Sequence, residues 1–139
     1  MDTKVTIISS ATQEVEISRE KPTVIVGERI NPTGCKKVLK ALEMGNFDLI
    51  ILGTMDAFRL VEQADFVRSV LALGKKIVVA ALRLPYDLMA FPKTQTYLCT
   101  YGIQEPSMFA LAKALFGEID SQGKLPVSIP ELYPVGYKK

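Results

Sequence analysis

Three charged residues near the middle of the chain have types and spacing that could support chemistry. Asp56 follows one apolar run, and Arg83 and Asp87 follow the next. Hydrolysis of a glycosidic bond uses two carboxyl groups that flank the bound sugar, so Asp56 and Asp87 could form such a pair. In the structural alternative, Asp87 caps the short segment after it and Arg83 pairs with an acidic neighbour or a carbonyl group. We favour the structural alternative and assign no catalytic residue.

The stretch GERINPTG holds a second group of polar residues. Glu28 and Asn31 offer hydrogen-bonding side chains. Gly34 and Lys36 stand at the start of a helical pattern, where free N–H groups and a lysine favour a small anion. The glycine spacing matches neither common phosphate-binding motif, which argues against a nucleotide. In the structural alternative, Gly27 and Gly34 only permit a tight turn from strand to helix.

The composition excludes several kinds of catalysis. The chain has 139 residues and no histidine, which removes Ser-His-Asp and Cys-His chemistry and the commonest transition-metal ligand. Cys35 lies near a predicted helix N-terminus beside Lys36 and Lys37, where a lowered thiol pKa is expected. Neither Cys35 nor Cys99 has a catalytic partner in the sequence. We therefore predict no catalytic residue, no metal and no cofactor.

Charge and hydropathy narrow the choice of partners. Lysine and arginine total 17 against 15 acidic residues, and no stretch concentrates them before the terminal Lys138 and Lys139, which argues against a nucleic-acid partner. No apolar run approaches the roughly 20 residues that span a bilayer, and the first residues do not resemble a signal peptide. These features predict a soluble, cytoplasmic protein.

The order of apolar patterns predicts an α/β fold. Alternating residues at 4–9 and 14–18 indicate an antiparallel β-hairpin at the N-terminus. Continuous apolar runs at 23–26, 49–52 and 77–82, with a weaker one at 97–101, are typical of parallel strands that are buried on both faces.

Helical patterns separate these runs. Gly45 and Gly74 end two of them and fit a left-handed C-terminal cap, and a third helix begins near Pro106 and ends at Gly117. Strands that alternate with helices predict a mostly parallel sheet in a three-layer, flavodoxin-like or Rossmann-like domain, with the hairpin at its N-terminus. We expect residues 1–139 to form one domain.

In such a sheet every strand-to-helix loop opens at one edge, the usual place for ligands. The predicted ligand-binding residues all lie in or beside these loops: Glu28, Asn31, Gly34, Lys36, Asp56, Arg83 and Asp87.

The stretch GERINPTG, with an apolar run before it and KK and an amphipathic helix after it, resembles the first strand and loop of the methyltetrahydrofolate methyltransferases. This family includes the pterin-binding domain of cobalamin-dependent methionine synthase. The resemblance covers residues 1–48 and implies that Glu28 and Asn31 lie beside the folate. The sequence departs at Cys35, where that family has a basic residue. Those (β/α)8 barrels need about 250 residues, and their main pterin-holding residues come from later strands.

Residues 49–139 resemble a different family. The segments LIILGTMDAF, KKIVVAALRLPYDLMAFP, TYLCTYG, SMFALAKALFGEI and GKLPVSIPELYP are similar in order and spacing to the C-terminal α/β sandwich domain of glycoside hydrolase family three, the β-N-acetylhexosaminidase-like members in particular. The resemblance implies that the catalytic aspartate belongs to a preceding barrel domain, which is not part of these residues.

The two resemblances meet within NFDLIILG, residues 46–53, where a helix leads into a strand. An engineered chimera without catalytic activity is the most economical explanation, and a natural fusion is the alternative. Two other functions stay open: a remnant pterin- or small-anion-binding module, and a fragment of a methyltransferase or glycoside hydrolase. A homodimer is also open, because exchanging elements between families can leave an apolar face uncovered.

Overall fold

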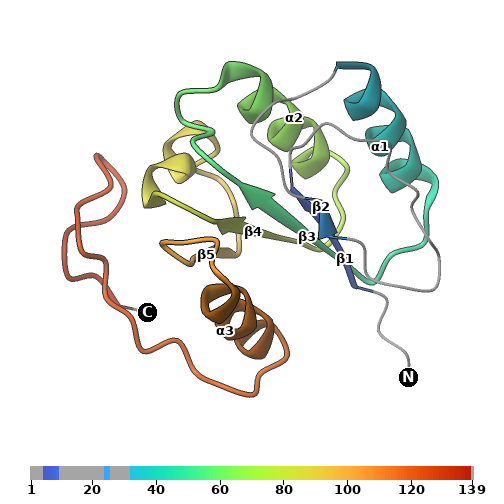
Figure 1. Ribbon diagram of the computed structural model, residues 1–139. Helices are drawn as coiled ribbons and strands as arrows, with labels where there is room; N and C mark the ends of the chain where they lie inside the picture. The colour runs from blue at the N-terminus through green and yellow to red at the C-terminus, as the bar shows by residue number, and fades with distance from the viewer. Residues whose placement is uncertain (1–4, 10–23, 26–31, 139) are drawn as a thin grey trace.

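The computed structural model describes residues 5–9, 24–25 and 32–138, in which five strands form one parallel sheet (Figure 1). The strand order β2-β1-β3-β4-β5 is that of flavodoxin-like folds, so the predicted α/β class is confirmed. The strands are β1 (Val5–Ser9), β2 (Val24–Ile25), β3 (Leu49–Thr54), β4 (Ile77–Ala81) and β5 (Tyr97–Cys99). The helices are α1 (Pro32–Met44), α2 (Val61–Leu71), the 3-10 helix η1 (Pro85–Ala90) and α3 (Glu105–Leu115).

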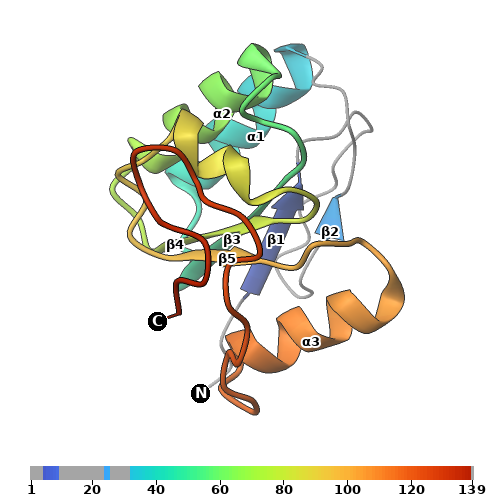
Figure 2. The ribbon, with the colours of Figure 1, turned by 90° about the vertical axis from the view of Figure 1, so that its left-hand side faces the viewer.

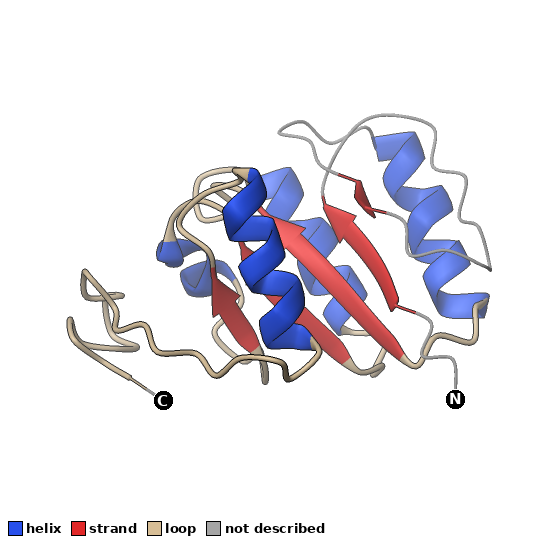
Figure 3. Cartoon of the chain, turned by 60° about the horizontal axis from the view of Figure 1, so that its bottom comes forward, coloured by secondary structure: helices blue, strands red, loops and turns tan. Residues whose placement is uncertain are grey.

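The helices cover both faces of the sheet, which gives three layers. Helices α1 and α2 lie on one face and α3 lies on the other (Figure 2). Side chains alternate along β3, so Leu52 packs in the α1/α2 core with Val67, whereas Ile51 packs on the α3 side beside Leu115. After α3 the chain runs without further helix along the side of the sheet where β5 is the edge strand (Figure 3).

The first strand does not pair as a hairpin. Strand β1 is parallel to both of its neighbours, with Ile7 and Ile8 paired to β2 on one edge and to β3 on the other. Because a strand has only two edges, these residues have no edge left for an antiparallel partner. The predicted N-terminal hairpin is therefore wrong for β1, and its second strand, residues 14–18, lies outside the described residues.

The helix-ending glycines act in two different ways. Gly74 and Gly117 have φ angles of 67° and 71°, as the left-handed cap requires. Gly45 is not among the residues with positive φ, so the cap predicted for it is wrong. A Cβ at Gly45 would clash with the ring of Phe47 and lie 2.8 Å from the carbonyl oxygen of Ala41. Glycine is therefore favoured at this position because there is no room for a side chain.

The predicted junction lies inside a packed region. Leu42 from α1 shares a core cluster with Ile50 of β3 and Val67 of α2. The ammonium group of Lys75, after α2, donates to the carbonyl oxygens of Gly45 at 2.6 Å and Glu43 at 3.2 Å at the end of α1. Residues on both sides of the junction therefore stabilise the same layer. None of the described helices has the length and apolar character needed to cross a membrane.

Candidate functional site

The carboxyl ends of β3 and β4 bring a polar cluster together at one edge of the sheet. Asp56 follows β3 in a turn whose backbone φ of 59° is unusual for a residue with a side chain and is best tolerated by Asp and Asn. Its carbonyl oxygen accepts hydrogen bonds from the N–H groups of Arg59 at 2.9 Å and Leu60 at 3.1 Å. This turn connects β3 to α2 and leaves Asp56 only 8% exposed.

The two oxygens of the Asp56 carboxylate have different surroundings. Oδ2 lies 3.0 Å from Nη1 of Arg83 and 3.1 Å from Nη2 of Arg59. Oδ1 is buried and accepts no hydrogen bond from any described residue. A buried carboxylate oxygen without a donor is costly, so this atom is a natural position for a donor from a buried water molecule.

Gln63, in the first turns of α2, has the complementary property. It is 1% exposed, and its Oε1 accepts the N–H of Met55 at 2.8 Å. Its Nε2 is buried and has no acceptor among the residues that the structure describes. A water molecule both donates and accepts, so a buried water can pair with the free atoms of Gln63 and Asp56.

The sequence analysis missed Gln63. The available signal was its position four residues before Val67, on the apolar face of the predicted helix. A glutamine on such a face needs a polar partner in the core.

Asp87 is completely buried and joins η1 to the end of β3. Its Oδ2 accepts a hydrogen bond from the Thr54 hydroxyl at 2.7 Å, and its Oδ1 accepts the N–H of Phe58 at 3.3 Å. Burial raises the pKa of Asp87 above its ordinary value, and the nearby charge of Asp56 acts in the same direction. The predicted role of Asp87 as a cap for the segment after it is wrong, because its hydrogen-bond partners Phe58 and Thr54 are 29 and 33 residues away.

Aromatic side chains hold η1 in place. The Tyr97 hydroxyl donates to the carbonyl oxygen of Pro85 at 3.0 Å and accepts the N–H of Leu88 at 3.2 Å. The rings of Phe58 and Tyr86 pack edge to face with their centres 5.6 Å apart. These contacts fix the loops on which Asp56 and Asp87 stand.

The structure brings together three of the seven residues predicted to bind a ligand. Asp56 and Arg83 form an ion pair, and Asp56 lies close enough to Asp87 for its charge to raise the pKa of Asp87. The other described residues, Gly34 and Lys36, lie in the first turn of α1, where Gly34 is half-buried and Lys36 is exposed.

The remaining two residues, Glu28 and Asn31, lie outside the described residues. Folate binding by this loop therefore stays a prediction. Within residues 5–9, 24–25 and 32–138, no three His, Cys, Asp or Glu side chains are grouped so as to hold a metal ion.

Both thiols have raised pKa values. Burial raises the pKa of Cys35 above its ordinary value, so the lowered value predicted from its place near a helix N-terminus is wrong. Burial also raises the pKa of Cys99 to about 11. Desolvation of the thiolate outweighs the helix dipole at Cys35.

We expect both thiols to react slowly in the folded protein, because each unit of raised pKa lowers the thiolate fraction about tenfold. Native protein at pH 7.5 should react with dithiobis(nitrobenzoate) at least about ten times more slowly than protein in urea. A Cys99→Ser variant assigns the signal to Cys35. A fast reaction of that variant under native conditions would contradict the raised pKa of Cys35.

The strand order and the polar carboxyl edge define an open, flavodoxin-like α/β domain. No protein-family model matches the chain, and no curated protein matches it. One similar solved structure is described as a unique GCN5-related glucosamine N-acetyltransferase region in a fungal multi-domain glycoside hydrolase family 3 β-N-acetylglucosaminidase. The match covers 98% of this chain and 17% of the chain of that structure, with 27% sequence identity and a TM-score of 0.73.

A second similar structure is a glycoside hydrolase family 3 β-N-acetylglucosaminidase from a Paenibacillus species. The match covers 88% of this chain and 27% of the chain of that structure, with 19% sequence identity and a TM-score of 0.67. At this identity it supports the fold alone. The predicted likeness to glycoside hydrolase family 3 is thus supported, and the first match extends it beyond residues 49–139. These matches give no support to the methyltransferase likeness of residues 1–48 or to a chimera.

Proposed function

We propose that this chain is a non-catalytic α/β domain of the glycoside hydrolase family 3 type. The observation that carries the proposal is that one oxygen of the Asp56 carboxylate and both oxygens of the Asp87 carboxylate already have partners. Asp56 is paired with two arginines, and Asp87 accepts hydrogen bonds from Thr54 and Phe58. Glycoside hydrolysis needs one carboxyl group to protonate the leaving oxygen and another to attack or to activate water.

The raised pKa of Asp87 would suit a general acid, but its position does not. The side chain is completely buried, and a general acid must come within hydrogen-bonding distance of the atom that it protonates. The raised pKa is therefore a consequence of burial, and a substrate has no access to the carboxyl group of Asp87.

The exposed side of the Asp56 ion pair favours a second candidate function, the binding of a hydroxyl-bearing ligand. The guanidinium group of Arg59 is exposed, lies 3.1 Å from Oδ2 of Asp56 and offers further donors. A guanidinium group beside a carboxylate can pair with adjacent hydroxyls of a sugar. Likeness to β-N-acetylglucosaminidases makes N-acetylglucosamine the first ligand to test.

One set of measurements tests both candidates. We expect the purified chain to release no nitrophenol from 4-nitrophenyl N-acetyl-β-glucosaminide above the buffer rate. Release that is lost in Asp56→Asn would overturn the non-catalytic proposal. For binding, calorimetry with N-acetylglucosamine should show saturation that weakens about tenfold in Arg59→Ala, which removes the exposed donors beside Asp56. Glu62→Gln, on the exposed side of α2, is the matched control, and absence of binding would overturn this second function.

Three further parts of the proposal rest on the sequence. They are the joining of two families within residues 46–53, the remnant pterin or small-anion site, and the cytoplasmic location. A homodimer also stays a proposal, and one feature supports it. Phe109 on α3 and Phe116, the residue directly after α3, are 61% and 64% exposed, which leaves apolar surface uncovered at this helix.

A further inference from the structure

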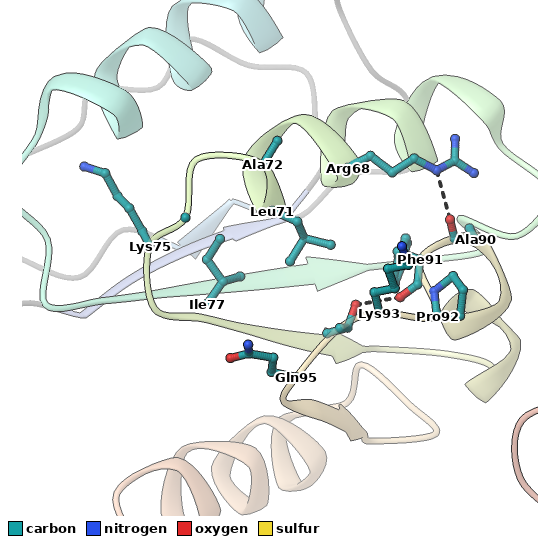
Figure 4. A pocket seen from close by; sticks show the side chains of 12 residues that line it. Arg68, Leu71, Ala72, Lys75, Ile77, Ala90, Phe91, Pro92, Lys93 and Gln95 are labelled. Carbon is teal, nitrogen blue, oxygen red and sulfur yellow. Dashed lines mark hydrogen bonds between the residues drawn. The ribbon is translucent and has the colours of Figure 1, made fainter.

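A groove of about 560 Å³ opens between the end of α2 and the segment that joins η1 to β5 (Figure 4). Ile77, the first residue of β4, lines it, so the groove lies at the opposite end of that strand from the polar cluster. None of the residues of the Asp56 and Asp87 cluster contributes to its lining. The lining consists of Arg68, Leu71, Ala72, Gly74, Lys75, Ile77, Ala90, Phe91, Pro92, Lys93, Thr94 and Gln95.

Hydrogen bonds hold the walls of the groove in position. Nε of Arg68 on α2 donates to the carbonyl oxygen of Ala90 at 2.9 Å and ties the two walls together (Figure 4). Thr94 donates to the carbonyl oxygen of Phe91 through its hydroxyl at 2.7 Å and through its N–H at 3.1 Å, which closes the turn of the second wall. The volume and fixed walls are typical of a preformed small-molecule site.

The charges that line the groove all have one sign. Among the described residues, its lining includes three cations, Arg68, Lys75 and Lys93, and no carboxylate. Arg68 is paired with Asp65 at 2.6 Å and contributes least. The ammonium group of Lys75 donates to the carbonyl oxygens of Glu43 and Gly45 at the end of α1 and forms no ion pair with a described residue, so its charge is opposed only by the partial negative charge of that helix end.

Lys93 is exposed, and no hydrogen bond or ion pair joins it to any described residue. The C-terminal ends of α1 and α2 oppose these charges with about half a negative charge each, which together is smaller than the charge of the two lysines. The potential in the groove is therefore positive.

The apolar part of the lining comes from both walls and from the sheet. Leu71 of α2 and Ile77 of β4 are only half-buried, and Pro92 is exposed on the opposite wall. A charged group alone would leave this apolar surface in water, whereas a ring or a short hydrocarbon chain would cover it.

We propose that this groove binds a small organic anion with an apolar body, such as an aromatic sulfonate or carboxylate. The anionic group forms an ion pair with Lys93, and the positive charge of Lys75 attracts it at longer range. The apolar body covers Leu71 and Ile77. This site is separate from the polar edge and does not depend on the function proposed for it.

Two probes that share a ring system separate charge from apolar contact. Anilinonaphthalenesulfonate carries the anion, and N-phenyl-1-naphthylamine is the same body without it. In fluorescence titrations at low salt we expect the anionic probe to bind at least about tenfold more tightly than the neutral one, and to lose affinity as salt is added.

Variants place the probe in the groove. Lys93→Glu on one wall and Ala72→Glu on the other should each weaken binding of the anionic probe about tenfold, because each puts a negative charge beside it. Lys40→Glu is the matched control, since Lys40 is exposed on α1 and does not line the groove. Each variant is first shown to unfold cooperatively, which excludes probe uptake by a loosened core. Equal affinity of the Lys93→Glu and wild-type proteins, or equal affinity for both probes, would overturn the proposal.

Discussion

Replacing Asp87 with alanine should lower the free energy of unfolding by about 3 kcal/mol, because it leaves buried donors without an acceptor. The Thr54 hydroxyl and the Phe58 N–H both lose their partner, and the completely buried carboxyl group leaves a cavity. Urea unfolding at pH 7 measures the loss. A loss below about 1 kcal/mol would mean that these groups find water instead, and that Asp87 does not join η1 to β3.

Asp87→Asn is the matched control, because it keeps the shape and one acceptor oxygen while removing the charge. Burial raises the pKa of Asp87, so the folded state favours the protonated carboxyl group. A group of this kind contributes stability that is fully present below its unfolded pKa, about 3.9 for Asp, and is lost as pH rises through its folded pKa.

The stability of the wild type relative to Asp87→Asn should therefore increase as pH falls from 7 to 4. A relative decrease in acid would mean that the hydrogen bonds from Thr54 and Phe58 outweigh burial and lower the pKa.

Most of the sheet could be predicted from the sequence because buried parallel strands have a strong pattern. The apolar runs at 49–52 and 77–82 correspond to β3 (Leu49–Thr54) and β4 (Ile77–Ala81). The position of β1 could not be predicted in this way. A short alternating stretch shows that a strand is present but does not show which neighbours occupy its edges, and those neighbours are β2 and β3.

The polar edge was only partly predictable. Asp56 and Arg83 were expected to converge because each follows a parallel strand, and they form an ion pair. The partners of Asp87 and the free amide of Gln63 depend on packing between distant segments, which local patterns do not encode. The pKa of Cys35 was predicted with the wrong sign for a related reason, since helix position is visible in the sequence and burial is not.

Replacing Leu42 with alanine should cost about 3 kcal/mol, because this fully buried side chain joins α1 to the core beneath it. Met44 is on the same helix and is 76% exposed, so Met44→Ala should change stability by less than about 0.5 kcal/mol. Urea unfolding of the two variants against the wild type measures both effects. Similar losses for the two changes would mean that α1 does not pack on the sheet as described.

A double-mutant cycle extends this experiment across the predicted junction at residues 46–53. Leu42 precedes the junction and Val67 follows it, yet both belong to one core cluster. Leu42→Ala and Val67→Ala should be non-additive, with a coupling of about 1 kcal/mol, because each change lets the other side chain relax into shared space. Additive losses would mean that Leu42 and Val67 do not share space across the junction. Coupling would mean that packing across residues 46–53 is specific, since a loosely packed boundary leaves voids that let neighbouring side chains act separately.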